Sequence, residues 1–271
     1  MKLILLLLGF AATASAQSAG VYVNHDKVNA ALAKGGALIA EPQVHVAGGH
    51  RDRPGALETQ KGTTILYITD GEGVFAAGAR SQRLIKGDLI VVPAGTTQAF
   101  TSVSPSISYY AVSVPVVSGL SRTPPSDSSR TPPSKAEVVY VGRDKVAAAL
   151  KKAGPLADGP NLRVSGGYRT GPYAPDAYRP DVEIHTNEAD LFYVIEGSAT
   201  HVLGGSVIGG RQTAPGQIRG SKIERGQTYH LGQGDVMWVP AGVPHWFPDI
   251  PEPLSYLLVK VFYPGSSVLS H

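Results

Sequence analysis

The sequence predicts an all-β protein made of two small antiparallel barrels in tandem, each preceded by a short helix. Three observations support this prediction. The chain repeats itself once. Outside two short helical stretches it alternates Val-, Ile-, Tyr- and Phe-rich runs with Gly and Pro, a pattern typical of antiparallel strands. Its 271 residues include 32 Gly and 21 Pro, which favour many turns over long helices.

The repeat is clearest near the start of each copy. Val21–Leu32 recurs as Val139–Leu150 with nine of twelve positions identical. Chance is a poor explanation, so the two halves are homologous domains. Two later pairs of segments continue the match, namely residues 65–71 with 191–197 and residues 87–95 with 234–242.

Apolar residues at helical spacing predict one short helix at the start of each copy. These helices cover Asp26–Lys34 and Asp144–Lys152. Gly154 and Pro155 end the second one. The helices therefore precede the strands of both barrels.

A Ser/Thr/Pro tract separates the copies. The hexapeptide at residues 121–126 is repeated at residues 129–134, and its prolines fit neither a helix interior nor a strand ladder. We interpret residues 119–136 as an exposed linker. This places the first domain at residues 17–118 and the second at residues 137–271.

The first sixteen residues read as a signal peptide. Lys2 supplies the positive start, Leu3–Phe10 the apolar run and Ala14–Ala16 the small-residue cleavage site, so the mature chain is expected to begin at Gln17. The apolar run is shorter than the ~18 residues that a transmembrane helix requires. We therefore expect a secreted or periplasmic protein.

Net charge and the lack of cysteine limit which partners and which metal ligands the sequence supports. The net charge of +3 is spread along the chain, which suggests neither a nucleic-acid partner nor a membrane surface. A small-molecule ligand or substrate is the remaining expectation. Because the chain has no cysteine, any metal would be held by nitrogen and oxygen.

Four residues of the second copy could carry chemistry. Glu183 and His185 are two apart, so on a strand their side chains share one face. Asp190 opens the next strand, and His245 follows a sharp turn after Pro240. A barrel would bring Glu183, His185, Asp190 and His245 together inside.

These residues resemble the two motifs of the cupin superfamily. The second motif, Gly-x5-Pro-x-Gly-x2-His, is met in full, whereas the first is met with departures. Asp190 stands at the family's Glu, His185 at its second His, and Glu183 at its first His. The resemblance implies two tandem cupin barrels of the double-stranded β-helix or jelly-roll type, with His185, Asp190, His245 and Glu183 as metal ligands. The second motif is formed by Gly234, Pro240, Gly242 and His245.

Imidazole and carboxylate ligands suit one divalent Fe, Mn, Zn or Ni ion, and the residues do not choose among them. Glu183 has three readings. It is the fourth ligand, the catalytic base, or a lining residue that only forms a hydrogen bond with His185.

The first copy lacks such a set. The alignment of the two copies places Leu57, Thr59, Thr64 and Gln98 at the four positions, and none of them is a good transition-metal ligand. We expect the first domain to be structural and to pack against the second barrel or a second subunit. The resemblance to bicupins and cupin dimers leaves a homodimer open. Two histidines, His45 and His50, lie upstream of these positions.

The second copy alone has an insertion, Gly204–Gln233. It is either a solvated hairpin or a lid with cationic groups for an acidic substrate. The residues that favour a lid are Arg211, Arg219, Lys222, Arg225, Tyr229 and His230. The simplest reading of Phe192, Trp238, Trp246 and Phe247 is that they are core aromatics.

Two functions remain open from the sequence. The first is a metal-dependent enzyme on a small molecule, with the reaction unresolved among dioxygenase, isomerase, decarboxylase and lyase, because fold does not select reaction. The second is a storage-like or ligand-binding bicupin whose metal site is structural or vestigial.

Overall fold

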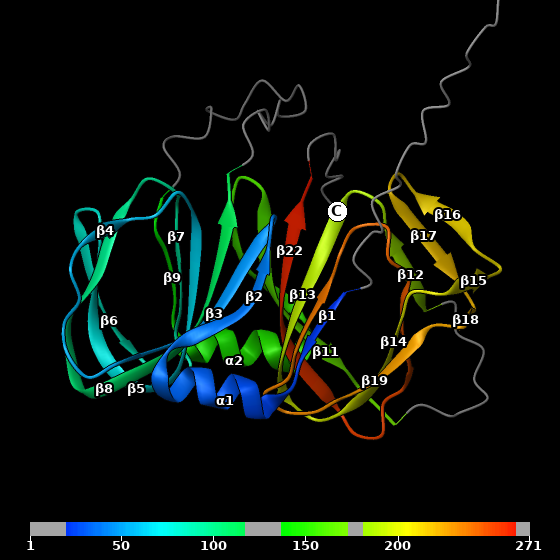
Figure 1. The fold of residues 1–271 in the computed structure, drawn as a ribbon, viewed down its shortest axis with the longest axis horizontal. Helices are drawn as coiled ribbons and strands as arrows, with labels where there is room; N and C mark the ends of the chain where they lie inside the picture. Colours follow the sequence, from blue (N-terminus) through cyan, green and yellow to red (C-terminus); the bar gives the residue numbers. More distant parts are fainter. Residues whose placement is uncertain (1–19, 117–136, 173–180, 264–271) are drawn as a thin grey trace, which may run out of the picture.

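The computed structural model describes residues 20–116, 137–172 and 181–263. The predicted signal peptide and the whole of the predicted linker lie outside these residues. Within them, two β-barrels stand side by side (Figure 1), as the sequence predicts. No described helix is long and apolar enough to cross a membrane.

Among its described residues the first copy contains one helix, α1 (His25–Lys34), within one residue of its prediction. Its strands are β1 (Val21–Val23), β2 (Gly36–Glu41), β3 (Val44–Arg51), β4 (Glu58–Thr59), β5 (Gly62–Ala77), β6 (Arg80–Ile85), β7 (Leu89–Val92) and β8 (Thr97–Pro115). The strands other than β1 form one sheet in the order β2-β3-β8-β5-β7-β9, in which β9 (Val139–Val141) comes from the second copy. Strand β4 also pairs with β8, and β6 with β5.

In residues 137–172 and 181–263 the second copy also has one helix, α2 (Arg143–Lys152), again within one residue of its prediction. Two six-stranded sheets form its barrel, in the orders β1-β20-β13-β22-β11-β10 and β16-β17-β12-β21-β14-β19. Its strands are β9 (Val139–Val141), β10 (Gly154–Asp158), β11 (Leu162–Arg169), β12 (Val182–His185), β13 (Glu188–Glu196), β14 (Ala199–Leu203), β15 (Ser206–Ile208), β16 (Arg211–Ala214), β17 (Gln217–Gly220), β18 (Lys222–Glu224), β19 (Gln227–Leu231), β20 (Val236–Val239), β21 (His245–Asp249) and β22 (Leu254–Phe262).

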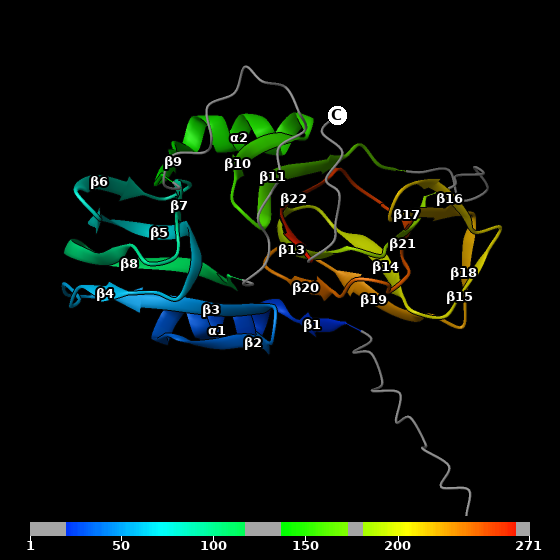
Figure 2. The same ribbon diagram turned by 90° about the horizontal axis from the view of Figure 1, so that it is seen from above.

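Each helix lies directly on a strand of its own copy. A Cβ added at Gly48 would come within 2.4 Å of the Ala31 carbonyl carbon in α1, and one at Gly166 within 2.5 Å of the Ala149 carbonyl carbon in α2. Only glycine permits this close approach. Figure 2 shows α1 and α2 on opposite sides of the molecule, in keeping with the internal repeat.

The first strand of each copy pairs with the barrel of the other copy. Strand β1 runs antiparallel to β20, with Val23 opposite Val236, and β9 runs antiparallel to β7, with Val141 opposite Leu89. The short helix that follows each strand therefore begins against the opposite barrel.

A buried aspartate anchors each exchanged strand. Asp235 accepts hydrogen bonds from the Tyr22 hydroxyl (3.0 Å) and the His25 backbone N–H (2.6 Å). In the other barrel Asp88 accepts from Tyr140 (3.2 Å) and from the Arg143 N–H (2.8 Å). Each carboxylate thus lies at the N-terminus of the partner copy's helix, where the helix dipole favours a negative charge.

A single hydrophobic core joins the two copies. One cluster contains buried residues from both, including Val23 and Ile65 from the first and Leu191 and Trp238 from the second. The rings of Tyr110 and Tyr193 stack across it at 4.5 Å. The first domain therefore packs against the second barrel, one of the two roles expected for it.

Candidate metal centre

The four residues singled out in the second copy meet inside its barrel. Strand β12 supplies Glu183 and His185, β13 supplies Asp190, and β21 supplies His245. One potential ligand atom from each lies within 4.8 Å of every other. In the part of the chain that the structure describes, this is the only cluster of three or more such groups.

The distances between the ligand atoms fit one ion. His185 Nε2 lies 3.5 Å from Glu183 Oε2 and 3.4 Å from Asp190 Oδ2, and His245 Nε2 lies 3.3 and 3.6 Å from the same two oxygens. Ligands about 2.1 Å from a tetrahedral ion are about 3.4 Å apart. The four atoms therefore surround a point that could hold a divalent metal.

Both histidines turn Nε2 toward that point. His185 Nδ1 lies 2.6 Å from Gln217 Oε1, and His245 Nδ1 lies 3.3 Å from the Val243 carbonyl oxygen. Since both partners are acceptors, each Nδ1 carries a hydrogen, and once the proton on Nε2 is lost each ring presents its Nε2 lone pair to a metal. The buried His245 Nε2 faces only the carboxylate oxygens of Glu183 and Asp190 among the described ion-pair contacts, at 3.3 and 3.6 Å.

The carboxylates are held ionised by their neighbours. Burial alone would raise the pKa of Glu183, but hydrogen bonds from His185 and His245 and the charge of Arg219 hold it well below its usual range. Arg219 also forms an ion pair with Glu183. Burial likewise opposes ionisation of Asp190, but Lys260 and His185 lower the pKa of that carboxyl.

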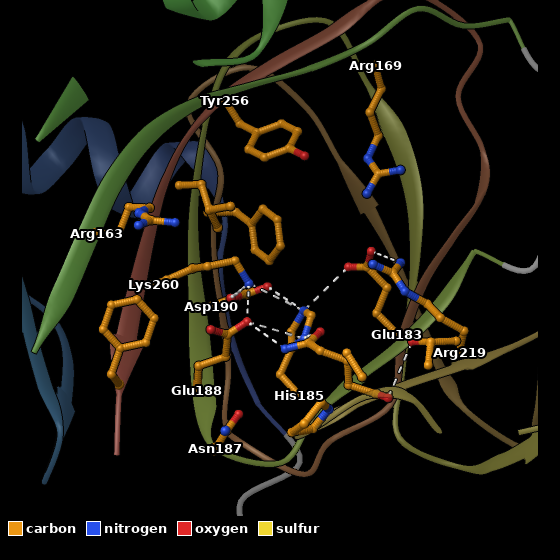
Figure 3. Close-up of a pocket in the computed structure, with 17 residues that line it drawn as sticks. Arg163, Arg169, Glu183, His185, Asn187, Glu188, Asp190, Arg219, Tyr256 and Lys260 are labelled. Carbon is orange, nitrogen blue, oxygen red and sulfur yellow. Dashed lines mark hydrogen bonds and ion pairs between the residues drawn. The ribbon is translucent and has the colours of Figure 1, made fainter. Parts of the chain in front are cut away.

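Lys260 closes one side of the cluster (Figure 3). Its Nζ lies 2.9 Å from Asp190 Oδ1, 2.8 Å from Glu188 Oε1 and 3.4 Å from His185 Nε2. Although burial would lower the pKa of Lys260, these carboxylates raise it, so the side chain is a cation. Gln217 completes the arrangement by donating from Nε2 to Glu188 Oε1 at 3.2 Å.

A pocket of about 500 Å³ opens over the cluster. Four cationic and three acidic side chains line it, together with Asn187, Gln217 and several apolar groups. The charged residues are Arg163, Arg169, Arg219, Lys260, Glu183, Glu188 and Asp190 (Figure 3).

The insertion contributes to this pocket, although only in part as the lid reading expects. Strand β17 brings Gln217 and Arg219 to the wall, β16 brings Thr213 and Ala214, and the turn between them adds Pro215. The other five residues that favour a lid do not line the pocket; they are Arg211, Lys222, Arg225, Tyr229 and His230.

Several pocket residues were not identified from the sequence. Gln217 and Lys260 belong to no motif, and they reach the cluster through the pairing of β17 with β12 and of β22 with β13. Glu188 stands only five residues after Glu183, in the segment that contains the first motif. Its position at the start of a strand was the only feature of the sequence that could have identified Glu188 as a pocket residue.

Three of the four aromatics expected in the core are buried, and Trp246 is half-buried. Phe192 lines the pocket. His201, for which the sequence offered no role, is fully buried, and its ring stacks on Phe247 at 4.2 Å. Burial, together with the charges of His245 and Arg169, holds the pKa of His201 well below its usual range, so the ring is neutral.

The structure corrects the comparison of the two copies at two positions. In the strand pairing, Glu58 lies opposite Gln98, just as Glu183 lies opposite His245. The Gln60 carbonyl accepts a hydrogen bond from the Gly95 N–H. The His185 carbonyl accepts the equivalent bond from the Gly242 N–H. The counterparts of Glu183 and His185 are therefore Glu58 and Gln60. The assignment to Leu57 and Thr59 was wrong, because the first copy has one residue fewer between this strand and the next.

The other two assignments hold. Thr64 pairs with Val92 as Asp190 pairs with Val239, and Gln98 stands at the position of His245. Only one of the four counterparts is a carboxylate and none is a histidine, so the first barrel offers no comparable ligand set within its described residues. His45 and His50 are exposed and belong to no such cluster.

Comparisons with known proteins agree with this architecture. Residues 166–264 match the family model described as Cupin. No curated protein matches the chain in sequence.

Solved structures resemble nearly the whole chain. Salicylate 1,2-dioxygenase from Pseudaminobacter salicylatoxidans has a TM-score of 0.60 at 14% identity, covering 94% of this chain and 87% of that one. A cupin 2 conserved barrel domain protein from Leptotrichia buccalis has a TM-score of 0.50 at 12% identity, covering 83% and 86%. A mutant of Bacillus subtilis oxalate decarboxylase has a TM-score of 0.50 at 13% identity, covering 83% and 70%. At these identities the likeness concerns the fold. The second domain therefore matches the cupin family model, and the two barrels together have the bicupin fold.

Proposed function

We propose that the second barrel holds one divalent Fe, Mn, Zn or Ni ion and is the active site of an enzyme that acts on a small organic acid. The observation that carries this proposal is the convergence of four ligand atoms beside a pocket of about 500 Å³, which Glu183, His185 and Asp190 line. Pockets of this size suit a small molecule.

The charge of the pocket supports an acidic substrate. Four cations face three carboxylates there, and a divalent ion adds two further positive charges. Lys260 pairs with Asp190 and Glu188, Arg219 with Glu183, and Arg163 with Asp158, and Arg169 lines the same pocket. Together these four side chains give the pocket the cationic groups that a substrate carboxylate would bind. The substrates named for two structural relatives, salicylate and oxalate, are also carboxylates.

Each residue of the cluster would have a distinct role in binding the metal or the substrate. His185, His245, Asp190 and Glu183 hold the ion, and Gln217 and the Val243 carbonyl fix the two imidazoles. When bound, the ion acts as a Lewis acid that polarises a substrate oxygen. Glu183 has the least buried side chain of the four, with 18% of its surface exposed, and so it is the ligand placed to exchange a proton with substrate.

A binding protein without catalysis is the second candidate. The observation that favours it is that Lys260 and Arg219 already neutralise Asp190 and Glu183 without any metal. In that case the pocket would bind an acid through its arginines alone.

Activity assays separate the two candidates. The purified protein is stripped with a chelator, reloaded separately with each of the four metals, and incubated with a panel of small mono- and dicarboxylic acids. We expect turnover of at least one acid with at least one metal and none in the stripped protein. Acid binding that is equally tight in both forms, with no turnover, would support the binding protein instead.

A further inference from the structure

The first barrel has a cavity of its own, of about 240 Å³. Strands β3, β4, β5 and β8 line it, and it contains the counterparts of the four clustered residues of the second barrel. It is therefore the same site in the fold with different chemistry at its base. The four counterparts are Glu58, Gln60, Thr64 and Gln98.

Two neutral polar side chains form the base of this cavity. Thr64 and Gln98 are each only 8% exposed, and Gln98 Nε2 donates to Thr64 Oγ1 at 3.0 Å. Gln98 Oε1 is buried and has no hydrogen-bond partner in the described part of the chain. A buried amide oxygen costs free energy unless a donor reaches it. The base thus offers an unused acceptor beside a hydroxyl group.

The deep walls are apolar. Leu66, Phe75 and Phe100 are at most 5% exposed, and the two phenyl rings meet edge to face at 4.8 Å. Leu66 stands at the position of Phe192, and Phe75 at that of His201. The interior of the first barrel therefore has neither the carboxylate nor the imidazoles found at the matching positions of the second barrel. Among the described residues, its deep walls carry no charged side chain.

Charged groups occur only nearer the mouth. Glu58 is exposed, and the half-buried Arg51 donates from Nε to the Tyr109 hydroxyl at 3.3 Å. An ion at the base would have no counter-charge beside Thr64 or Gln98, so burying one there is unfavourable. A neutral group with an N–H or O–H donor fits both the unused oxygen and the apolar walls.

We propose that the first barrel is a second, metal-free binding site for a small uncharged organic molecule. The ligand has an apolar body against Leu66, Phe75 and Phe100 and an amide or hydroxyl head that donates to Gln98 Oε1. Such a site gives the first barrel a function besides packing, and it does not depend on the activity proposed for the second barrel.

Matched neutral and charged probes test this site. Benzamide and 3-phenylpropanamide are titrated into the full chain by calorimetry, alongside benzoate and 3-phenylpropanoate, which have the same shape but carry a charge. We expect the amides to bind with dissociation constants of about 1 mM or lower, in keeping with their size. Gln98→Leu should weaken amide binding at least 10-fold, whereas His245→Ala, at the same position of the other barrel, should not change it.

Thr64→Val provides a second, nearly isosteric variant in case Gln98→Leu does not fold. It removes the hydroxyl group that orients Gln98 and should weaken amide binding about 3- to 10-fold, with an unchanged circular dichroism spectrum. The proposal is overturned if neither amide binds, or if amide binding survives both variants. It is also overturned if the carboxylates compete with the amides at the same site with equal affinity.

Discussion

At the scale of single residues, the centre depends on carboxylates that are kept ionised inside a barrel. The sequence motifs identified all four clustered residues, because the spacing of two residues on β12 and the turn before His245 are local features. Glu188, Gln217 and Lys260 were missed, since strand pairing over long sequence separations brings them in. Their residue types alone carry no signal for a metal centre.

Glu183 is the residue whose role is most open, and its geometry favours direct coordination. Its Oε2 lies 3.3 Å from His245 Nε2 and 3.5 Å from His185 Nε2, as expected for two ligands of one ion. We expect Glu183→Gln to lower metal affinity about 10-fold or more in a competition assay with a chromogenic chelator. Glu58→Gln, at the matching position of the first barrel, is the control and should have no effect. Unchanged affinity with turnover reduced about 100-fold would assign Glu183 as a base instead.

The protonation of His185 predicts how metal binding depends on pH. Burial alone would lower the pKa of His185, but hydrogen bonds with Asp190 and Glu183 raise it from 6.5 to about 9 in the metal-free protein. A metal must displace this proton, so its apparent affinity should rise about 10-fold per pH unit from pH 6.5 to about 9.

The same pKa shift of His185 also predicts how the stability of the metal-free protein changes with pH. Because the folded pKa lies above the unfolded value, the stabilisation is complete below pH 6.5 and is lost as the pH rises through about 9. Chemical unfolding across this range measures it, with His185→Asn as the control that lacks the loss. A metal affinity that does not change between pH 6.5 and 9 would contradict the protonated His185.

At the scale of elements, the hairpin β16–β17 completes the site from within the insertion. The sequence predicted that residues 204–233 are either a solvated hairpin or a lid, and composition could not decide between them. The structure pairs β17 with β12 over four residues, so this hairpin extends the ligand-bearing sheet. A pairing between strands that are far apart in the sequence leaves no local signal.

Gln217 is the residue through which this hairpin acts on the metal ligands. Gln217→Ala removes the acceptor 2.6 Å from His185 Nδ1, so the imidazole loses the partner that fixes its tautomer and orientation. We expect a 10- to 100-fold loss of metal affinity, measured by the same chelator competition. Gln212→Ala, an exposed position on β16, is the matched control. Equal affinity in the two variants would show that the hairpin only covers the site.

At the scale of the whole molecule, the two barrels are joined by exchanged strands. The sequence predicted two repeats, each with a helix followed by a barrel, and the structure agrees. It could not predict that β1 and β9 cross over, because a Val-Tyr-Val strand is compatible with the edge of either barrel. The alignment of the two copies failed at Glu58 and Gln60 for another reason, because only strand pairing reveals that the connection to the next strand is one residue shorter there.

The exchange predicts that the second copy is not stable by itself. Residues 137–271 without the first copy lose β1 and expose the edge of β20, and Asp235 loses its bonds to Tyr22 and His25. We expect this fragment to aggregate, or to melt at least about 10 °C below the intact chain in calorimetry. Co-expression with residues 17–136 should restore a soluble complex. Melting of the isolated fragment at the temperature of the full chain would contradict the exchange.

The central claim, one metal centre in the second barrel and none in the first, is tested most directly by elemental analysis. The full chain, reconstituted with metal and freed of excess ion, should contain about one divalent transition-metal ion per chain. His245→Ala should lose most of this metal, and Gln98→Ala, the same position in the first barrel, should keep it. A ratio near two, or an equal loss from both variants, would contradict the asymmetric site.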